Sequence, residues 1–248
     1  TLFRSQKYAN LLTNYCLEVE PDERIYIRST YLAEPLLQEL TKAIAKAGAT
    51  PFFDIAFAEQ QNLWMNHASD AALRKPNPFR QMAMERFEGY LFIRAPFNLS
   101  DASAIPAGKR RLAQQASKSM MKTYMKRTAD RSLKRSLCQF PTHASAQAAG
   151  MTLSEYQSFV FNATKLTEED PIAQWKKLGH HQQKIVDHLN TCSTIHYKGP
   201  DIDIRFSTKG RTWINSDGKT NMPSGEVYTA PVEDSVNGVI RFSHPSMY

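Results

Sequence analysis

The sequence predicts an α/β protein, with an N-terminal parallel-sheet α/β domain followed by the beginning of an antiparallel β domain. In the first part, strand and helix patterns alternate with short links, which is typical of parallel strands joined by crossover helices. From about residue 193, short alternating segments separated by Gly and Pro turns replace the helical patterns. We therefore place the α/β domain at residues 1–198 and an incomplete β-rich domain at residues 199–248.

The first strand, helix and strand lie within residues 23–57. Residues 23–30 are rich in β-branched and aromatic side chains, and Thr30 can cap the helix that follows. That helix repeats Leu and Ile along one face up to Gly48, a residue that readily adopts the left-handed conformation that ends a helix. A second strand follows at residues 51–57. This order with short links predicts a right-handed βαβ unit.

The α/β pattern continues through the next hundred residues. Helices broken around a Lys-Pro-Asn-Pro sequence are expected at residues 58–87. Residues 89–96 give a third strand that is apolar enough to be central, and residues 98–108 form a loop rich in small side chains. A further short strand ends at Pro141, which cannot donate to a sheet ladder.

Two helices are predicted before the β-rich part. Thr152 and Glu155 have the spacing of a capping box at the start of the first. Asp170 and Pro171 provide a cap and a first-turn proline for a second, long helix.

The β-rich part consists of short segments that are too few to enclose a large core. Its strand candidates are residues 193–199, 201–210, 211–217, 225–231 and 237–245. Because these segments span only about 50 residues, we expect a thin core and an unfinished domain.

Composition indicates an ordinary soluble globular protein, with 42% hydrophobic and 22% charged residues. No apolar run approaches the roughly 20 residues needed to cross a bilayer, and the N-terminal segment lacks the order of a signal peptide. We expect a cytoplasmic protein without membrane partners. Cys16, Cys138 and Cys192 are odd in number and widely spaced, which favours buried free thiols over disulfides or a thiolate zinc site.

Residues 109–138 are predicted to form a basic helix. They contain ten Lys and Arg residues and one acidic residue, Asp130, in a chain whose formal net charge is +7. Apolar residues recur at helical spacing from Leu112 to Leu137, leaving other faces to the charges.

A row of lysines on this helix leaves two interpretations open. Lys118, Lys122 and Lys126 could neutralise nucleic-acid phosphates, or they could form a solvated helix face. No zinc-finger, helix-turn-helix or aromatic RNA-binding pattern accompanies the charge, so nucleic acid is not favoured as a partner. An acidic protein surface is another possible partner for the row.

Searches for short catalytic patterns identify no enzyme class. Gly210 and the Gly-Lys-Thr at residues 218–220 do not have phosphate-loop spacing. The sequence also contains no G-x-G-x-x-G, H-E-x-x-H or G-x-S-x-G pattern.

Two sets of polar residues are weak site candidates. His180, His181 and His188 lie on the long helix without the i, i+4 spacing of metal ligands on adjacent turns, which favours solvated histidines. Asp54 lies near the carboxyl end of a strand, where α/β proteins bind ligands, although capping or packing is the favoured interpretation.

Glu226 lies at the start of a strand, immediately after the turn sequence of residues 221–225. A carboxylate at this position is well placed to be one metal ligand among several from neighbouring strands. A surface glutamate would have the same pattern, so the residues alone leave both interpretations open.

Longer stretches around Glu226 carry a family resemblance. "KGRTWINSDGK" at residues 209–219 and "NMPSGEVYTAPVEDSVNGVIRFS" at 221–243 resemble the start of the catalytic domain in the aminopeptidase T and aminopeptidase S family of dinuclear metallo-aminopeptidases, also called thermophilic metalloproteases. Residues 7–36 and 140–163 resemble two stretches of that family's N-terminal domain. The likeness spans nearly the whole chain.

The resemblance implies a cytoplasmic, homodimeric aminopeptidase acting on peptides with a free N-terminus. It implies two divalent metal ions, zinc or cobalt, that activate a water molecule, with Glu226 as a metal ligand. It also implies that residues 199–248 begin the catalytic domain, and that the remaining ligands and the general base lie beyond Tyr248. No catalytic residue is therefore assigned within the 248 residues.

One carboxylate cannot hold two divalent cations against water, so the 248-residue chain alone is expected to be inactive. The rival hypothesis is a non-catalytic α/β protein that binds peptide or nucleic acid through the basic helix at residues 109–138.

Overall fold

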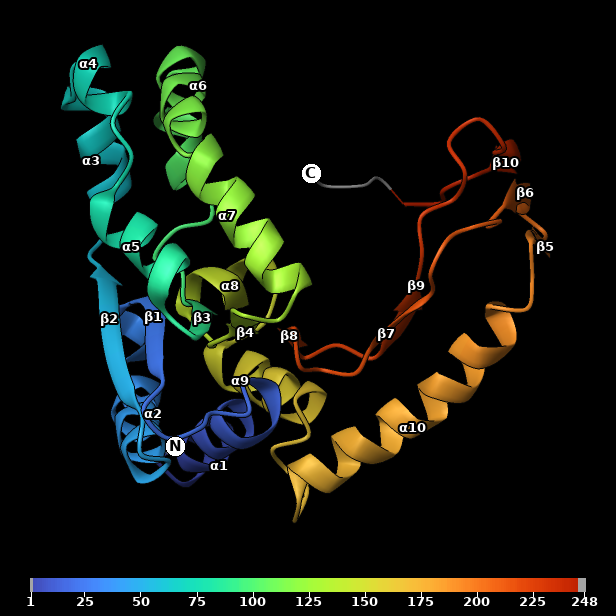
Figure 1. Cartoon of the computed structure of the whole chain (residues 1–248), viewed down its shortest axis with the longest axis horizontal. Helices are drawn as coiled ribbons and strands as arrows, with labels where there is room; N and C mark the ends of the chain where they lie inside the picture. Colours follow the sequence, from blue (N-terminus) through green and yellow to red (C-terminus); the bar gives the residue numbers. More distant parts are fainter. Residues whose placement is uncertain (1, 245–248) are drawn as a thin grey trace. The chain divides into compact units, whose positions relative to one another are not determined.

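Five parallel strands form the sheet that organises the N-terminal part of the chain (Figure 1). The computed structural model describes residues 2–244. The strand order is β2-β1-β3-β4-β8, and every neighbouring pair is parallel. The strands are β1 (Arg24–Thr30), β2 (Thr50–Ala56), β3 (Gly89–Arg94), β4 (Lys134–Gln139) and β8 (Asn221–Met222). The expected parallel-sheet α/β architecture is confirmed.

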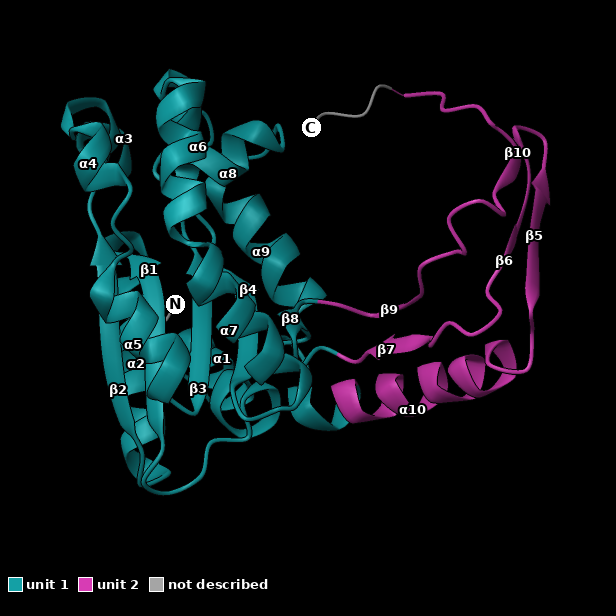
Figure 2. Cartoon of the chain, turned by 45° about the horizontal axis from the view of Figure 1, so that its top comes forward, with its two compact units in different colours: residues 1–174, 218–223 teal, residues 175–217, 224–248 magenta. Residues whose placement is uncertain are grey.

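The chain divides into two compact units (Figure 2). Unit 1 comprises residues 1–174 and 218–223, and unit 2 comprises residues 175–217 and 224–248. The expected division into domains at residues 1–198 and 199–248 stays a prediction, because the division into compact units does not test it.

One layer of unit 1 is built around α2 (Glu34–Lys46), the crossover helix between β1 and β2. Leu36, Leu40 and Ile44 repeat at helical spacing and are fully buried, as the sequence predicts. Gly48 has a φ of +79°, which only glycine adopts readily, and it ends the helix as expected.

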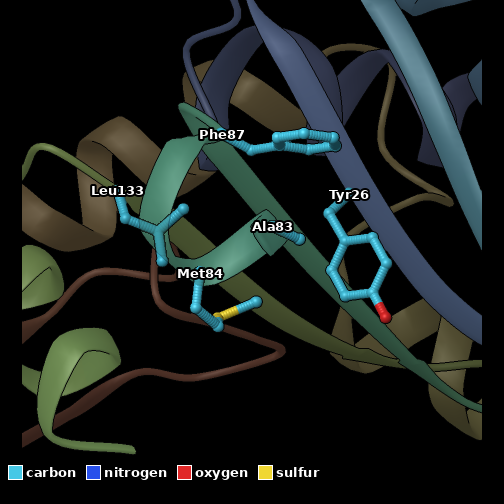
Figure 3. Close-up of a cluster of buried hydrophobic side chains, with 5 residues drawn as sticks. All are labelled: Tyr26, Ala83, Met84, Phe87 and Leu133. Atoms are coloured by element: carbon cyan, nitrogen blue, oxygen red, sulfur yellow. The ribbon is translucent and has the colours of Figure 1, made fainter. Parts of the chain in front are cut away.

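A second layer covers the other face of the sheet through a buried apolar cluster (Figure 3). The cluster joins Tyr26 of β1 to Ala83, Met84, Phe87 and Leu133. The ring of Phe87 meets that of Tyr26 edge-on, with centroids 6.4 Å apart. Because side chains alternate along a strand, β1 contributes to the cores on both of its faces.

Short helices complete unit 1. They are α1 (Leu2–Leu11), a π-helical turn (Leu12–Cys16), a 3₁₀ turn (Tyr31–Ala33), α3 (Gln60–His67), α4 (Asp70–Leu73), α5 (Pro78–Arg86), a 3₁₀ turn (Asp101–Ala104), α6 (Ala107–Ala116), α7 (Lys118–Ala129), α8 (His143–Ala148) and α9 (Leu153–Ala163). The capping box at the start of α9 is confirmed, because Thr152 Oγ1 accepts from Glu155 N at 3.3 Å while Glu155 Oε2 accepts from Thr152 N at 2.8 Å. Across residues 2–244, no helix combines the length and apolarity needed to cross a membrane.

The prediction of one basic helix over residues 109–138 is wrong. The helix is interrupted at Ser117, whose hydroxyl donates to the carbonyl of Ala113 at 3.0 Å and competes with the helical pattern. It ends at Ala129, and Asp130 then accepts from the backbone N–H of Ser132 at 2.9 Å in a turn. Leu137 lies on β4, because pairing with the central strand β3 overrides local helix propensity.

The three lysines of the predicted row are exposed on the shorter helix α7. They are Lys118, Lys122 and Lys126. The row therefore spans one helix of 12 residues rather than a continuous basic surface along residues 109–138.

Residues far apart in sequence meet at the last strand of the sheet. Residues 221–222, expected to be part of a turn, instead form β8 and pair in parallel with β4. The hydroxyl of Tyr8 on α1 lies 3.4 Å from the carbonyl oxygen of Met222, and Lys219 pairs with Glu18 at 2.8 Å. The Met222–Pro223 peptide bond is cis. The return of the chain to unit 1 thus completes both the sheet and the surroundings of α1.

Unit 2 contains most of α10 (Pro171–Leu189) and two antiparallel sheets. One sheet has the order β10-β6-β5 and the other pairs β7 with β9. The strands are β5 (Thr194–Gly199), β6 (Ile202–Ser207), β7 (Ile214–Ser216), β9 (Glu226–Tyr228) and β10 (Asn237–Ile240). All four residues of β10 are exposed, including Val239 at 69%. The expected antiparallel strands are confirmed, and their apolar surface is largely uncovered.

Candidate functional site

Glu226, the predicted metal ligand, opens β9 in unit 2 and pairs with Ser216 of β7. Its backbone carbonyl oxygen accepts a hydrogen bond from Gln182 Nε2 at 2.7 Å. The residue is exposed, and its carboxylate makes no hydrogen bond or ion pair with any residue between 2 and 244. The backbone of Glu226 is therefore fixed, while its charge is available to solvent.

Gln182 on α10 binds the backbone where Ser216 of β7 pairs with Glu226 of β9. The side chain is only 4% exposed, and Nε2 also lies 3.4 Å from the carbonyl oxygen of Ser216. One amide thus donates to both strands at the point where Ser216 and Glu226 pair. Sequence reasoning missed Gln182, because a glutamine on an amphipathic helix has no local pattern that distinguishes an anchor from a solvated residue.

Gly225 sets the approach of the chain to Glu226. Its φ is +109°, and an added Cβ would lie 3.3 Å from Leu178 Cδ2 on α10. Its N–H donates to the carbonyl of Ser216 at 3.1 Å. A glycine is needed here for both the backbone conformation and the close approach to the helix.

Polar contacts hold β7 against the same helix. Asn215 Nδ2 donates to the carbonyl oxygen of Gly179 at 2.9 Å and to Gln183 Oε1 at 3.1 Å. The hydroxyls of Ser216 and Ser224 lie 2.6 Å apart. The β7–β9 pair is therefore anchored to α10 by several hydrogen bonds that do not involve the Glu226 carboxylate.

The residues around Glu226 do not by themselves form a metal centre. Within residues 2–244 there is no group of three or more His, Cys, Asp or Glu side chains arranged to hold a metal ion. Two buried amide oxygens in unit 2, Gln182 Oε1 and Asn215 Oδ1, have no hydrogen-bond partner among the described residues, but amide oxygens are not the ligands that zinc sites use. Glu226 supplies one suitable ligand, and a catalytic zinc site needs three from the protein.

The histidines considered as metal ligands belong to no group of three or more possible ligands within residues 2–244. His180, His181 and His188 are all exposed on α10, as the solvated interpretation expects. His196 of β5 lies 2.8 Å from Asp203 of β6, a cross-strand contact in the other sheet of unit 2.

A second constellation lies in unit 1 around Asp54 of β2. Asp54 Oδ2 accepts from the Tyr26 hydroxyl at 2.7 Å and from Arg80 Nε at 3.0 Å, and Arg28 Nε lies 3.3 Å away. Partial burial would raise the pKa of the Asp54 carboxyl, but the Tyr26 hydrogen bond and the two arginines together lower it below its ordinary value. Burial and the contact with Asp54 raise the pKa of Tyr26. Asp54 therefore accepts hydrogen bonds from Tyr26 and Arg80 and forms an ion pair with Arg28.

This constellation lies at the carboxyl edge of the sheet, where the sequence suggested that Asp54 could face a crevice. Asp54 lines a cavity of about 240 Å³ together with Thr30 and Arg94, which are the last residues of β1 and β3. A larger cavity of about 700 Å³ shares Arg28, Thr30 and Arg80 with it. Openings at this edge are where open α/β sheets bind ligands.

The chain is similar to a known protein family along nearly its whole length. A family model described as "Thermophilic metalloprotease (M29)" matches residues 3–248. Aminopeptidase 2 of Geobacillus stearothermophilus is 26% identical over 269 residues, covering 98% of this chain and 64% of the relative. Aminopeptidase AmpS of Bacillus subtilis (strain 168) is 31% identical over 120 residues, covering 44% of this chain and 28% of the relative.

A solved structure has the same fold. Wild-type AmpT from Thermus thermophilus matches with a TM-score of 0.78 and 22% identity, over 98% of this chain and 65% of that chain. The matched regions are 64% of the length of Aminopeptidase 2 and 65% of the AmpT chain, so this chain spans about two thirds of the length of these two proteins.

Proposed function

The chain belongs to the thermophilic metalloprotease (M29) family, and from this premise we propose that the complete protein is a metal-dependent aminopeptidase. Its substrates are peptides with a free N-terminus, from which it releases the N-terminal amino acid. The observation that carries the proposal is the match of 98% of this chain to Aminopeptidase 2. A cytoplasmic location and a homodimeric state stay predictions.

Glu226 is the ligand that this chain contributes to a site for two divalent ions, zinc or cobalt. Support comes from its exposed carboxylate, which has no cation partner in the described part of the chain, and from its anchored backbone. A preorganised strand favours metal binding because little conformational entropy is lost when the ion is held. The other ligands and the general base belong to residues outside the described range.

The 248-residue chain is accordingly proposed to be inactive on its own. Described residues supply one ligand and no cluster of three, so no hydrolytic step can be assigned to their side chains. The rival hypothesis of a non-catalytic binding protein has no observation in its favour beyond the exposed lysines of α7.

The test compares Glu226→Gln with the parent in the complete protein, using a leucyl anilide substrate and added zinc or cobalt. Loss of one metal ligand is expected to lower kcat/KM by more than about 100-fold and to reduce bound metal measured by mass spectrometry. Asp234→Asn is the matched control, since Asp234 is an exposed carboxylate with no hydrogen bond or ion pair among described residues. Unchanged activity and metal content in Glu226→Gln would remove Glu226 from the site.

A further inference from the structure

Three arginines line the cavity of about 240 Å³ at the carboxyl edge of the unit 1 sheet. They are Arg28 of β1, Arg80 of α5 and Arg94 of β3, and Asp54 is the one carboxylate in the lining. Two positive charges therefore remain after Asp54 is counted.

The pairing with Asp54 leaves donors on the arginines. Both Arg28 and Arg80 approach Asp54 through Nε, so their terminal nitrogens are not used in that contact. Among described residues, the terminal nitrogens of Arg80 and the whole guanidinium of Arg94 make no hydrogen bond. A guanidinium with its terminal N–H groups unused can bind an oxyanion with two parallel hydrogen bonds.

Arg28 is held in place by three neighbours on the two adjacent strands, β2 and β3. Its Nη1 donates to the Tyr90 hydroxyl at 3.3 Å, and its guanidinium lies over the ring of Phe92, 5.4 Å from the centroid. The third contact, Asp54, is fixed by Tyr26, whose ring belongs to the buried cluster of Figure 3 while its hydroxyl points away from that cluster. A guanidinium already ordered in this way loses little entropy on binding a ligand.

The larger cavity of about 700 Å³ has room for the body of a ligand whose anionic end lies at the arginines. Its lining includes exposed aromatic side chains, among them Phe57 and Trp64, each 54% exposed. Its charged lining residues are Glu59 and Asp101 with Lys75 and the shared Arg28 and Arg80. An apolar body fits the aromatic part of this lining.

We propose that the two cavities, which share Arg28, Thr30 and Arg80, together bind a small organic carboxylate with an apolar body. Arg80 and Arg94 hold the carboxylate in the smaller cavity, and the apolar body lies in the larger one. N-blocked amino acids have this chemistry. The proposal uses no residue of the Glu226 region, and it stands or falls independently of the peptidase function.

The test measures binding of N-acetyl-L-leucine to the 248-residue chain without added metal. Binding is detected as a change in the fluorescence of Trp64. The other two tryptophans, Trp175 and Trp213, are 1% and 7% exposed, so Trp64 is the one placed to respond. Trp64→Phe should abolish the signal. N-acetyl-L-leucinamide, which lacks the carboxylate, should bind at least about tenfold more weakly, since a charge-assisted bidentate contact is lost.

Arg94→Gln should weaken binding of N-acetyl-L-leucine about tenfold without affecting folding, because Arg94 is exposed and its side chain makes no hydrogen bond or ion pair with described residues. Arg80→Gln should weaken it to a similar extent. Arg111→Gln, which removes an exposed arginine that lines neither cavity, should leave binding unchanged. Circular dichroism checks that each variant is folded.

Three results would overturn the proposal. The first is equal binding of the acid and its amide, and the second is no saturation up to about 10 mM. The third is stronger binding of inorganic phosphate that competes with N-acetyl-L-leucine and depends on Arg94, which would assign the cavity to phosphate instead.

Discussion

Gln182 on α10 donates a hydrogen bond to the backbone carbonyl of Glu226, 2.7 Å away, and so couples the candidate metal ligand to a helix rather than to its own strand alone. The amide is buried, so its replacement removes this donor from the Glu226 carbonyl and leaves the Ser216 carbonyl with the Gly225 N–H. Loss of a buried hydrogen-bond partner costs about 1–3 kcal/mol.

Gln182→Leu should therefore lower the free energy of unfolding by about that amount and reduce metal binding in the complete protein. Chemical denaturation and metal titration measure the two effects. Lys184→Ala, an exposed change on the same helix, serves as the control. A stability loss with unchanged metal affinity would show that Gln182 supports the fold and not the position of Glu226.

Gly225→Ala should be destabilising, because φ at this position is +109° and an added Cβ would lie 3.3 Å from Leu178. The expected loss is about 1–3 kcal/mol in the free energy of unfolding. Gly108→Ala is the matched change, since nothing lies within 4 Å of a Cβ there and the residue is on α6. Alanine at that helical position should stabilise slightly. Equal effects of the two substitutions would contradict the assignment of a strained conformation to Gly225.

Acid should weaken the fold partly through Asp54. The folded-state pKa of Asp54 is lowered, so its stabilising contribution is fully present above the unfolded-state value of about 3.9 and is lost as pH falls through the folded value. Asp54→Asn should therefore show a shallower loss of melting temperature than the parent below about pH 4.

Thermal melts across that range measure the difference between the two slopes. Asp234→Asn provides the comparison for a carboxylate without a hydrogen bond or ion pair among described residues, and it should follow the parent curve. An Asp54→Asn curve parallel to that of the parent would mean that the arginine contacts do not stabilise the ionised form.

The three cysteines should differ in reactivity. None of the three forms a disulfide, as the sequence predicts. The expected burial holds for Cys16 and Cys138 but not for Cys192, which is partly exposed. Burial raises the pKa of the Cys138 thiol to about 12, so it holds little thiolate at neutral pH. Reaction with a disulfide reagent should show one fast thiol, and Cys192→Ser should remove it. A second fast thiol in the folded parent would contradict the burial of Cys16 and Cys138.

Local chemistry predicted the first βαβ unit because its determinants are close in sequence. Gly48 ends α2 by its own backbone freedom, and Thr152 and Glu155 satisfy each other across one turn. Such features depend on few neighbours, so they survive in the folded protein.

Non-local pairing explains what the sequence did not predict. Leu137 fits a helical stripe, yet β4 pairs with β3 on one side and with β8 on the other. The two residues of β8 carry no strand pattern of their own. Similarly, no spacing distinguishes Glu226 from a surface glutamate. Its proposed role rests on family likeness, and its anchors on α10 became visible only in three dimensions.

Because β8 comes late in the sequence, the sheet of unit 1 can be completed only late in synthesis. The fifth strand of the sheet and the carbonyl that faces Tyr8 are supplied by residues 221–222, more than 200 positions after α1. At about 5–20 residues per second, a ribosome makes them several seconds after residue 174. The nascent α/β unit therefore waits for a segment that is translated only after most of α10 and β5 to β7, and until then the outer edge of β4 is open to any other strand.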